Sequence, residues 1–176
     1  MFLHLLFLLA SSDPNSFDRF ERRYKDKSHC DTVGISNQGA IKIEAADYKE
    51  SYLRGCQNLV SVELADDLTE IKKYSFYGSS LTTIDWGKAE ISTIGEGAFA
   101  FCEKLTSITL PSSVTQIDEG AFFFSHITGP GFGNCNDLTI IGKSAYEGSL
   151  IKDTISFSSK PVGLNINDRA FHSTKI

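Results

Sequence analysis

The sequence contains few of the residue patterns that mark enzymes and metal sites. Its four histidines never occur at the spacing of a metal pair on a helix. No Gly-x-Ser-x-Gly motif of a nucleophilic serine is present. These absences leave no positive reason to propose catalysis. We therefore expect a non-enzymatic protein with no catalytic residues, no bound metal and no cofactor.

Two short patterns resemble functional motifs but lack a required feature of each. Gly142-Lys143-Ser144 resembles the end of a phosphate-binding loop, but Asp137 stands where that loop needs a glycine, and its charge would repel phosphate. Glu96 and Glu119 look like a carboxylate pair. They recur at equivalent positions of a repeat described below, so we expect two solvated, outward-facing residues instead of an acid and a base.

Clustered positive charge is also scarce. The net charge is −5 and the isoelectric point is about 5.3. The one basic cluster, at 19–27, is mixed with acidic residues. Phosphate binding needs clustered Lys and Arg, so we expect no nucleic-acid partner. Phe17, Phe20 and Tyr24 follow a helical spacing and predict a short amphipathic helix in this region.

Only one long apolar run is present, at the start of the chain. The segment MFLHLLFLLASS (1–12) combines an apolar stretch with small residues that suit cleavage before Asp13. It predicts a signal peptide, with a buried N-terminal segment as the alternative. The run is too short to cross a bilayer, and no second one follows, so we expect no membrane span in this chain.

What the sequence does contain is a repeated phrase: Ile, three variable residues, a small residue and an aromatic. Its clearest copies are Ile94–Phe99 and Ile117–Phe122. A period of this length is typical of solenoids, in which each unit covers the next. The aromatics that end the copies follow one another at steps of 23, 23, 24 and 25 residues: Phe76, Phe99, Phe122, Tyr146 and Phe171.

Each unit predicts the same succession of local structures. In the copy at 105–122, Ile108 and Leu110 alternate with Thr109 as in a half-buried strand, and Pro111 then starts a turn. A second short apolar segment follows, and then one turn of helix or an irregular arc. Stacked units align like residues in columns. Beside the aromatics these are Leu59, Leu81, Leu105 and Ile127; Val62, Ile84, Ile108, Pro130 and Ile155; and Leu64, Trp86, Leu110, Phe132 and Phe157.

The unit Leu-x-x-Ile-x-Leu-Pro-x-x-Val-x-x-Ile-x-x-x-Ala-Phe at 105–122 resembles the BspA-type leucine-rich repeat. The resemblance covers roughly residues 40–171. It implies a mainly β solenoid of the leucine-rich-repeat type, with a strand plus a short helix or irregular arc per unit of about 23 residues. It also implies a BspA-like surface antigen or adhesin, and the family has no catalytic residues to carry over. Ser75 in place of Ala and Pro130 in a strand position depart from the pattern.

The domain organisation follows from these observations. We expect a signal peptide at 1–12, an N-terminal cap region at 13–40 and a solenoid of about five units at 41–176, with its last unit incomplete or uncapped. An uncapped end exposes apolar side chains and a strand edge, so end-to-end self-association is a further expectation.

Four cysteines are compatible with disulfides in a secreted chain. Cys56 and Cys102 hold the same repeat position two units apart. Strands about 4.8 Å apart would place their Cα atoms roughly 10 Å apart, beyond the reach of a disulfide. We therefore expect small buried apolar residues at both positions, and the pair Cys30 with Cys56 stays open.

The function expected is a secreted or cell-surface module that contacts a protein or matrix ligand, in adhesion or another protein–protein interaction. The alternative is a structural spacer or a fragment of a longer repeat array, intracellular in one version, with no ligand of its own. The candidate contact residues are the outward positions between the apolar columns: Glu63, Thr83, Asp85, Ser107 and Thr109.

Overall fold

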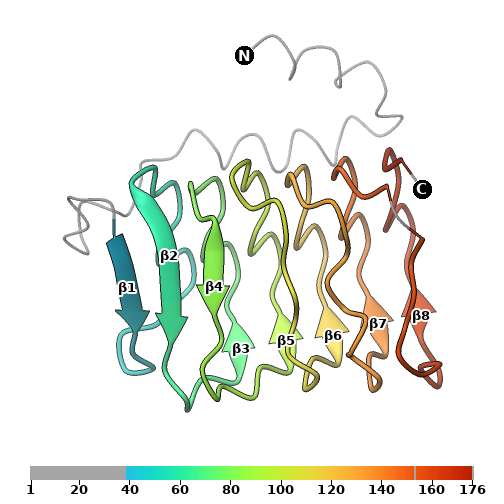
Figure 1. Ribbon diagram of the computed structural model, residues 1–176, viewed down its shortest axis with the longest axis horizontal. Coiled ribbons are helices and arrows are strands. Elements are labelled where there is room, and N and C mark those ends of the chain that lie inside the picture. Colours follow the sequence, from blue (N-terminus) through green and yellow to red (C-terminus); the bar gives the residue numbers. More distant parts are fainter. Residues whose placement is uncertain (1–38, 153, 176) are drawn as a thin grey trace, which may run out of the picture.

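The computed structural model describes residues 39–152 and 154–175. These residues wind into a β-solenoid of about five turns, with β1 at one end and β8 at the other (Figure 1). The predicted signal peptide and the aromatic stripe near residue 20 lie outside the described residues. Within the described part, no helix is long and apolar enough to cross a membrane.

The first sheet gathers strands from successive turns at the N-terminal end of the solenoid. Its strands are all parallel and follow the order β1-β2-β4. At the end of β2 the buried residues Val62 and Leu64 face the core, while Glu63 between them faces solvent. This alternation is the signature of a sheet covered on one face. The strands are β1 (Gly39–Ile43), β2 (Leu59–Leu64) and β4 (Thr83–Asp85).

The second sheet runs along the solenoid and follows the second apolar piece of each unit. It is parallel, in the order β3-β5-β6-β7-β8. Each strand is two residues long and ends in the isoleucine of the repeated phrase. These isoleucines are fully buried except Ile166 in the edge strand β8, which is 54% exposed. The strands are β3 (Glu70–Ile71), β5 (Thr93–Ile94), β6 (Gln116–Ile117), β7 (Ile140–Ile141) and β8 (Asn165–Ile166).

The aromatic residues of the repeated phrase form one continuous stack, which confirms the predicted column. We call Phe76, Phe99, Phe122, Tyr146 and Phe171 the aromatic ladder. Successive ring centroids are 5.1, 5.2, 4.9 and 5.2 Å apart, with nearly parallel planes. This spacing is close to the separation of neighbouring β-strands. The stack therefore repeats in step with the backbone.

Backbone hydrogen bonds tie each ladder residue to the next turn. The N–H of Phe99 donates to the carbonyl of Ala121 at 2.7 Å, and the N–H of Phe122 donates to the carbonyl of Ala145 at 2.7 Å. The carbonyl of the residue that precedes each aromatic thus accepts a hydrogen bond from the aromatic residue of the previous turn. Since Ala121 and Ala145 are fully buried, the position accepts only a small side chain. The arc around them consists of irregular turns, so the irregular arc is found and not the turn of helix that was the other expectation.

The strand predicted at Ile108–Leu110 is wrong. The first sheet ends at β4, and the segment 107–109 does not join its ladder. On the side of the next turn, Pro130 occupies the equivalent position and has no N–H to donate, so a regular ladder cannot form there. The N–H of Leu110 donates to the carbonyl of Gly131 at 2.8 Å. The segment is thus bonded irregularly to the following turn, and on its other side it does not pair with β4.

Each turn also needs a residue in the left-handed backbone region at one fixed position of the arc. Two copies use glycine there, Gly97 (φ 60°) and Gly120 (φ 61°). The other copies carry side chains that strain the backbone: Ser51 (φ 60°), Tyr74 (φ 56°), Ser144 (φ 54°) and Arg169 (φ 59°). The Ser144 hydroxyl is also buried with no hydrogen-bond partner. The repeat geometry therefore overrides the local preference of these residues.

The aromatic ladder predicts a large cost for truncating its central ring. Phe99→Ala should lower the free energy of unfolding by about 3–5 kcal/mol, because it removes a fully buried ring and leaves a cavity between two neighbours. Urea unfolding followed by circular dichroism measures the loss. Val162→Ala, at a side chain that is 92% exposed, is the control and should change stability by less than about 0.5 kcal/mol. A loss below about 1 kcal/mol for Phe99→Ala would contradict a supporting role for the ladder.

The left-handed position predicts a stabilising substitution. Ser144→Gly should raise the free energy of unfolding by about 1 kcal/mol, because relief of backbone strain and removal of an unsatisfied buried hydroxyl exceed the chain entropy of glycine. Gly120→Ala, at the same position of the neighbouring turn, should lower stability. Thermal unfolding of both variants beside the parent chain checks this. A lower melting temperature for Ser144→Gly would show that the serine is not strained.

Candidate partner-binding surface

The five predicted contact residues all lie on the solvent-facing side of the solenoid. Glu63 is in β2, Thr83 and Asp85 are in β4, and Ser107 and Thr109 belong to the next turn; each is exposed. In the ladder between β2 and β4, Glu63 pairs directly with Asp85. The structure thus gathers these residues over three neighbouring turns. Whether they contact a partner stays a prediction.

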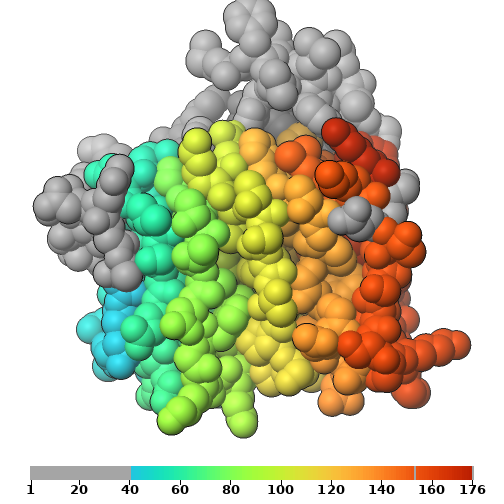
Figure 2. All heavy atoms as spheres, in the orientation of Figure 1, coloured from blue at the N-terminus to red at the C-terminus, as the bar shows by residue number. Residues whose placement is uncertain are grey.

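A groove separates β4 from the segment 107–109 on this face. It encloses about 260 Å³, and we call it the β4 groove. Figure 2 shows the face that carries it, where the chain passes from green to yellow. Three of the predicted contact residues lie in its wall, together with three half-buried apolar residues. The lining is Thr83, Ile84, Trp86, Ser107, Ile108 and Thr109.

The groove exists because the first sheet ends at β4 and the segment 107–109 of the next turn does not pair with it. The segment 107–109 lies against the turn around Gly131. The backbone of Gly131 is so close to the carbonyl of Ile108 that an added Cβ would lie 2.7 Å from that oxygen. Only glycine allows this contact. Sequence reasoning placed Trp86 and Ile108 in core columns and missed their partial exposure. The available signal was the Gly-Pro-Gly triplet at 129–131, which is incompatible with a regular ladder strand.

The charge beside the groove is negative. Glu63 and Asp85 are paired across two parallel strands, and like charges opposite one another on a sheet are unfavourable. The Asp85 carboxylate accepts one hydrogen bond, from the N–H of Gly87 at 3.0 Å. On its other side Glu63 pairs directly with Lys42 of β1, whose ammonium lies 3.6 Å from the Glu44 carboxylate. Asp85 faces no basic residue in this ladder, so it is the carboxylate that a positively charged group of a partner would suit.

The buried charges elsewhere are engaged in holding the fold. Glu147 is almost fully buried, and Arg169 binds its carboxylate with two donors, at 2.5 and 3.1 Å. The expectation that Glu96 is solvated is wrong. Its side chain is 15% exposed, accepts a hydrogen bond from the Tyr74 hydroxyl and lies 3.3 Å from the Lys73 ammonium. Glu96 therefore takes part in the contacts between neighbouring turns, and Glu119, at the equivalent position of the next turn, is half-buried.

The described residues contain no group of three or more His, Cys, Asp or Glu side chains placed to hold a metal ion. The Gly142-Lys143-Ser144 triplet lies in a repeat turn after β7. A Cβ at position 142 would lie 2.5–2.6 Å from the backbone of residues 118–119. The glycine is thus required by the close approach of two turns, as the repeat pattern indicated.

Two of the three cysteines among the described residues are free. Cys102 and Cys135 are buried thiols, and burial raises the pKa of Cys102 to about 12 and that of Cys135 to about 11. Cys102 is therefore a small buried residue as expected, and it is not paired with Cys56. Cys56 is equally buried but disulfide-bonded. Its partner lies outside the described residues.

Both free thiols should resist modification in the folded protein. At pH 8 the raised pKa values leave almost no reactive thiolate, and burial denies access to a reagent. N-ethylmaleimide should leave Cys102 and Cys135 unlabelled in native conditions and label both in about 6 M guanidinium, as mass spectrometry can measure. Rapid native labelling of either residue would show that its turn opens.

The fold and this surface define a class: a solenoid repeat protein that exposes a polar, grooved face. The BspA type leucine rich repeat region model matches the chain in six copies over residues 40–152. The chain belongs to this family. No curated protein and no solved structure matches it.

Proposed function

We propose that this chain is a secreted or cell-surface protein that binds another protein through the exposed face of β2, β4 and the segment 107–109. The observation that carries the proposal is the β4 groove, where half-buried apolar side chains open to solvent beside polar residues. Interfaces typically combine such an apolar centre with a polar rim. Membership of a family of repeat proteins suited to protein interaction supports the same function.

The disulfide of Cys56 supports an extracellular location. Disulfides persist in oxidising compartments and are rare in the cytosol. This agrees with the signal peptide predicted at 1–12.

A reporter fused after residue 20 tests the secretory part. We expect export and an N-terminus at Asp13 after cleavage, measured by mass spectrometry of the secreted fusion. The matched control replaces Leu5 and Leu6 by Asp, which should keep the reporter inside the cell. An uncleaved cytosolic reporter on the parent sequence would remove the secretory proposal.

Capture of partners from a solubilised extracellular-matrix and cell-surface extract tests the binding part. The double variant Glu63→Lys and Asp85→Lys should lose captured proteins that the parent chain retains, because it reverses the charge beside the groove. Glu70→Lys, an exposed residue on β3 in the other sheet, is the control and should behave like the parent. Identical protein sets for the parent and the double variant would contradict this surface as the contact.

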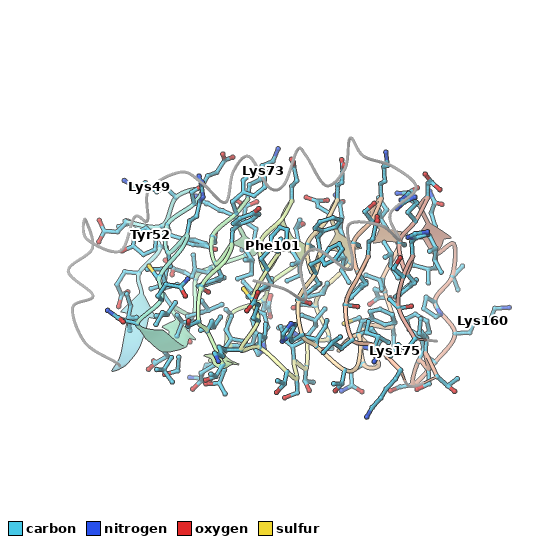
Figure 3. All side chains as sticks on the ribbon, turned by 90° about the horizontal axis from the view of Figure 1, so that it is seen from above. Lys49, Tyr52, Lys73, Phe101, Lys160 and Lys175 are labelled. Carbon is cyan, nitrogen blue, oxygen red and sulfur yellow. The ribbon has the colours of Figure 1, made fainter. Side chains whose placement is uncertain are left out.

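The edge strand β8 favours the alternative of a spacer within a longer array. Ile166 and Val162 are exposed there, and a hollow of about 550 Å³ lies beside Phe157 and Leu164. Lys160 also lines this hollow and projects from the same end of the solenoid (Figure 3). A further turn would cover these apolar residues. Pairing with a second copy at the same edge stays a prediction.

A further inference from the structure

The volume of the β4 groove limits what it can hold. Small-molecule sites usually enclose about 300–1000 Å³ and surround most of the ligand. The groove has a volume of about 260 Å³ and is open along the exposed face, so it would not surround a ligand. It suits an inserted side chain of a larger partner that covers the rest of the face.

The walls of the groove select the chemistry of that side chain. Ile84 and Ile108 supply aliphatic sides, and Trp86 supplies an aromatic surface. Aromatic pairs gain contact energy beyond the area they bury. Thr83 and Thr109 lie at the exposed margin, where hydroxyl groups bind main-chain atoms or water. The combination fits a phenylalanine-sized anchor on an extended peptide.

The charge next to the groove selects the neighbour of the anchor. Asp85 lies between two lining residues, Ile84 and Trp86, and Glu63 is its direct partner on β2. Two exposed carboxylates side by side repel each other. Lys42 pairs with Glu63 from β1, whereas Asp85 faces no basic residue in the ladder. A Lys or Arg beside the anchor would pair with Asp85, and the contact adds both orientation and on-rate.

We propose that the β4 groove binds an exposed segment of a partner protein in which an aromatic side chain is flanked by Lys or Arg. The aromatic ring enters between Ile84 and Ile108 against Trp86, and the basic residue meets Glu63 and Asp85. This inference rests on the proposed protein-binding function and specifies the partner that the surface recognises.

The only tryptophan of the chain makes the groove directly observable. Trp86 lines the groove and also packs against the core, so its fluorescence reports on this part of the solenoid. The probe is the synthetic peptide Gly-Ser-Lys-Phe-Lys-Ser-Gly, titrated into the full mature chain. We expect a saturable shift of the Trp86 emission that weakens as salt rises from about 0.05 to 0.5 M. Peptides with Ala for Phe, or with Glu for both Lys, should bind at least about tenfold more weakly.

Two substitutions at one repeat position separate the groove from the rest of the face. Thr109→Arg fills the groove margin and should weaken peptide binding by at least about tenfold. Ser156→Arg, at the aligned position two units further along, is the matched control and should bind like the parent. Asp85→Lys should transfer the preference to the Glu-containing peptide. Because Asp85→Lys removes a like-charge pair, it should remain folded.

The inference is overturned if the Lys-Phe-Lys peptide leaves Trp86 emission unchanged, if the Glu peptide binds equally well, or if Thr109→Arg has no effect. These outcomes are distinct from failure of the proposed function. A partner whose binding is abolished by the Glu63→Lys and Asp85→Lys variant but resists Thr109→Arg would keep the protein-binding role and remove the anchor. If the parent chain captures no partner but binds the peptide, the proposed binding of whole proteins is contradicted and the groove's preference for a short aromatic and basic segment is retained.

Discussion

The structure depends on the equal spacing of stacked turns. A backbone N–H can reach the carbonyl of the next turn only if the turns remain about one strand separation apart. The aromatic ladder maintains that spacing from the side-chain side, with ring centroids 4.9–5.2 Å apart. The bonds from Phe99 to Ala121 and from Phe122 to Ala145 maintain it from the backbone side. Side chains and main chain thus impose the same repeat.

That requirement explains several local compromises. Ser144 and Arg169 adopt left-handed backbone conformations because the arc needs them at that point of every turn. Gly95 and Gly142 stand where neighbouring turns approach too closely for a Cβ. A unit cannot choose its own geometry, since it must match the unit on each side. Local preferences therefore yield to the period.

The repeat is less regular on the exposed face than in the rest of the solenoid. The second sheet runs from β3 to β8 without interruption, but the first sheet stops at β4. The segment 107–109 contacts the following turn around Gly131 but does not pair with β4, and the β4 groove lies between β4 and the segment. The solenoid remains intact because its second sheet and its aromatic ladder continue past this point. A solenoid can therefore tolerate a gap in one of its sheets without losing its fold.

The sequence alone determined the repeat, the solenoid class, the aromatic ladder and the outward position of Glu63, Thr83, Asp85, Ser107 and Thr109. These features follow from periodic spacing, which every unit reports independently. Only the tertiary structure decided that Ile108–Leu110 leaves the first sheet, that Glu96 is bound to Tyr74 and Lys73, and that Trp86 lines a groove. Each of these depends on how one turn contacts a turn about 23 residues away. A spacing pattern shows which residues share a column, but it does not show whether the backbones of two neighbouring turns form a ladder of hydrogen bonds, and between β4 and 107–109 they do not.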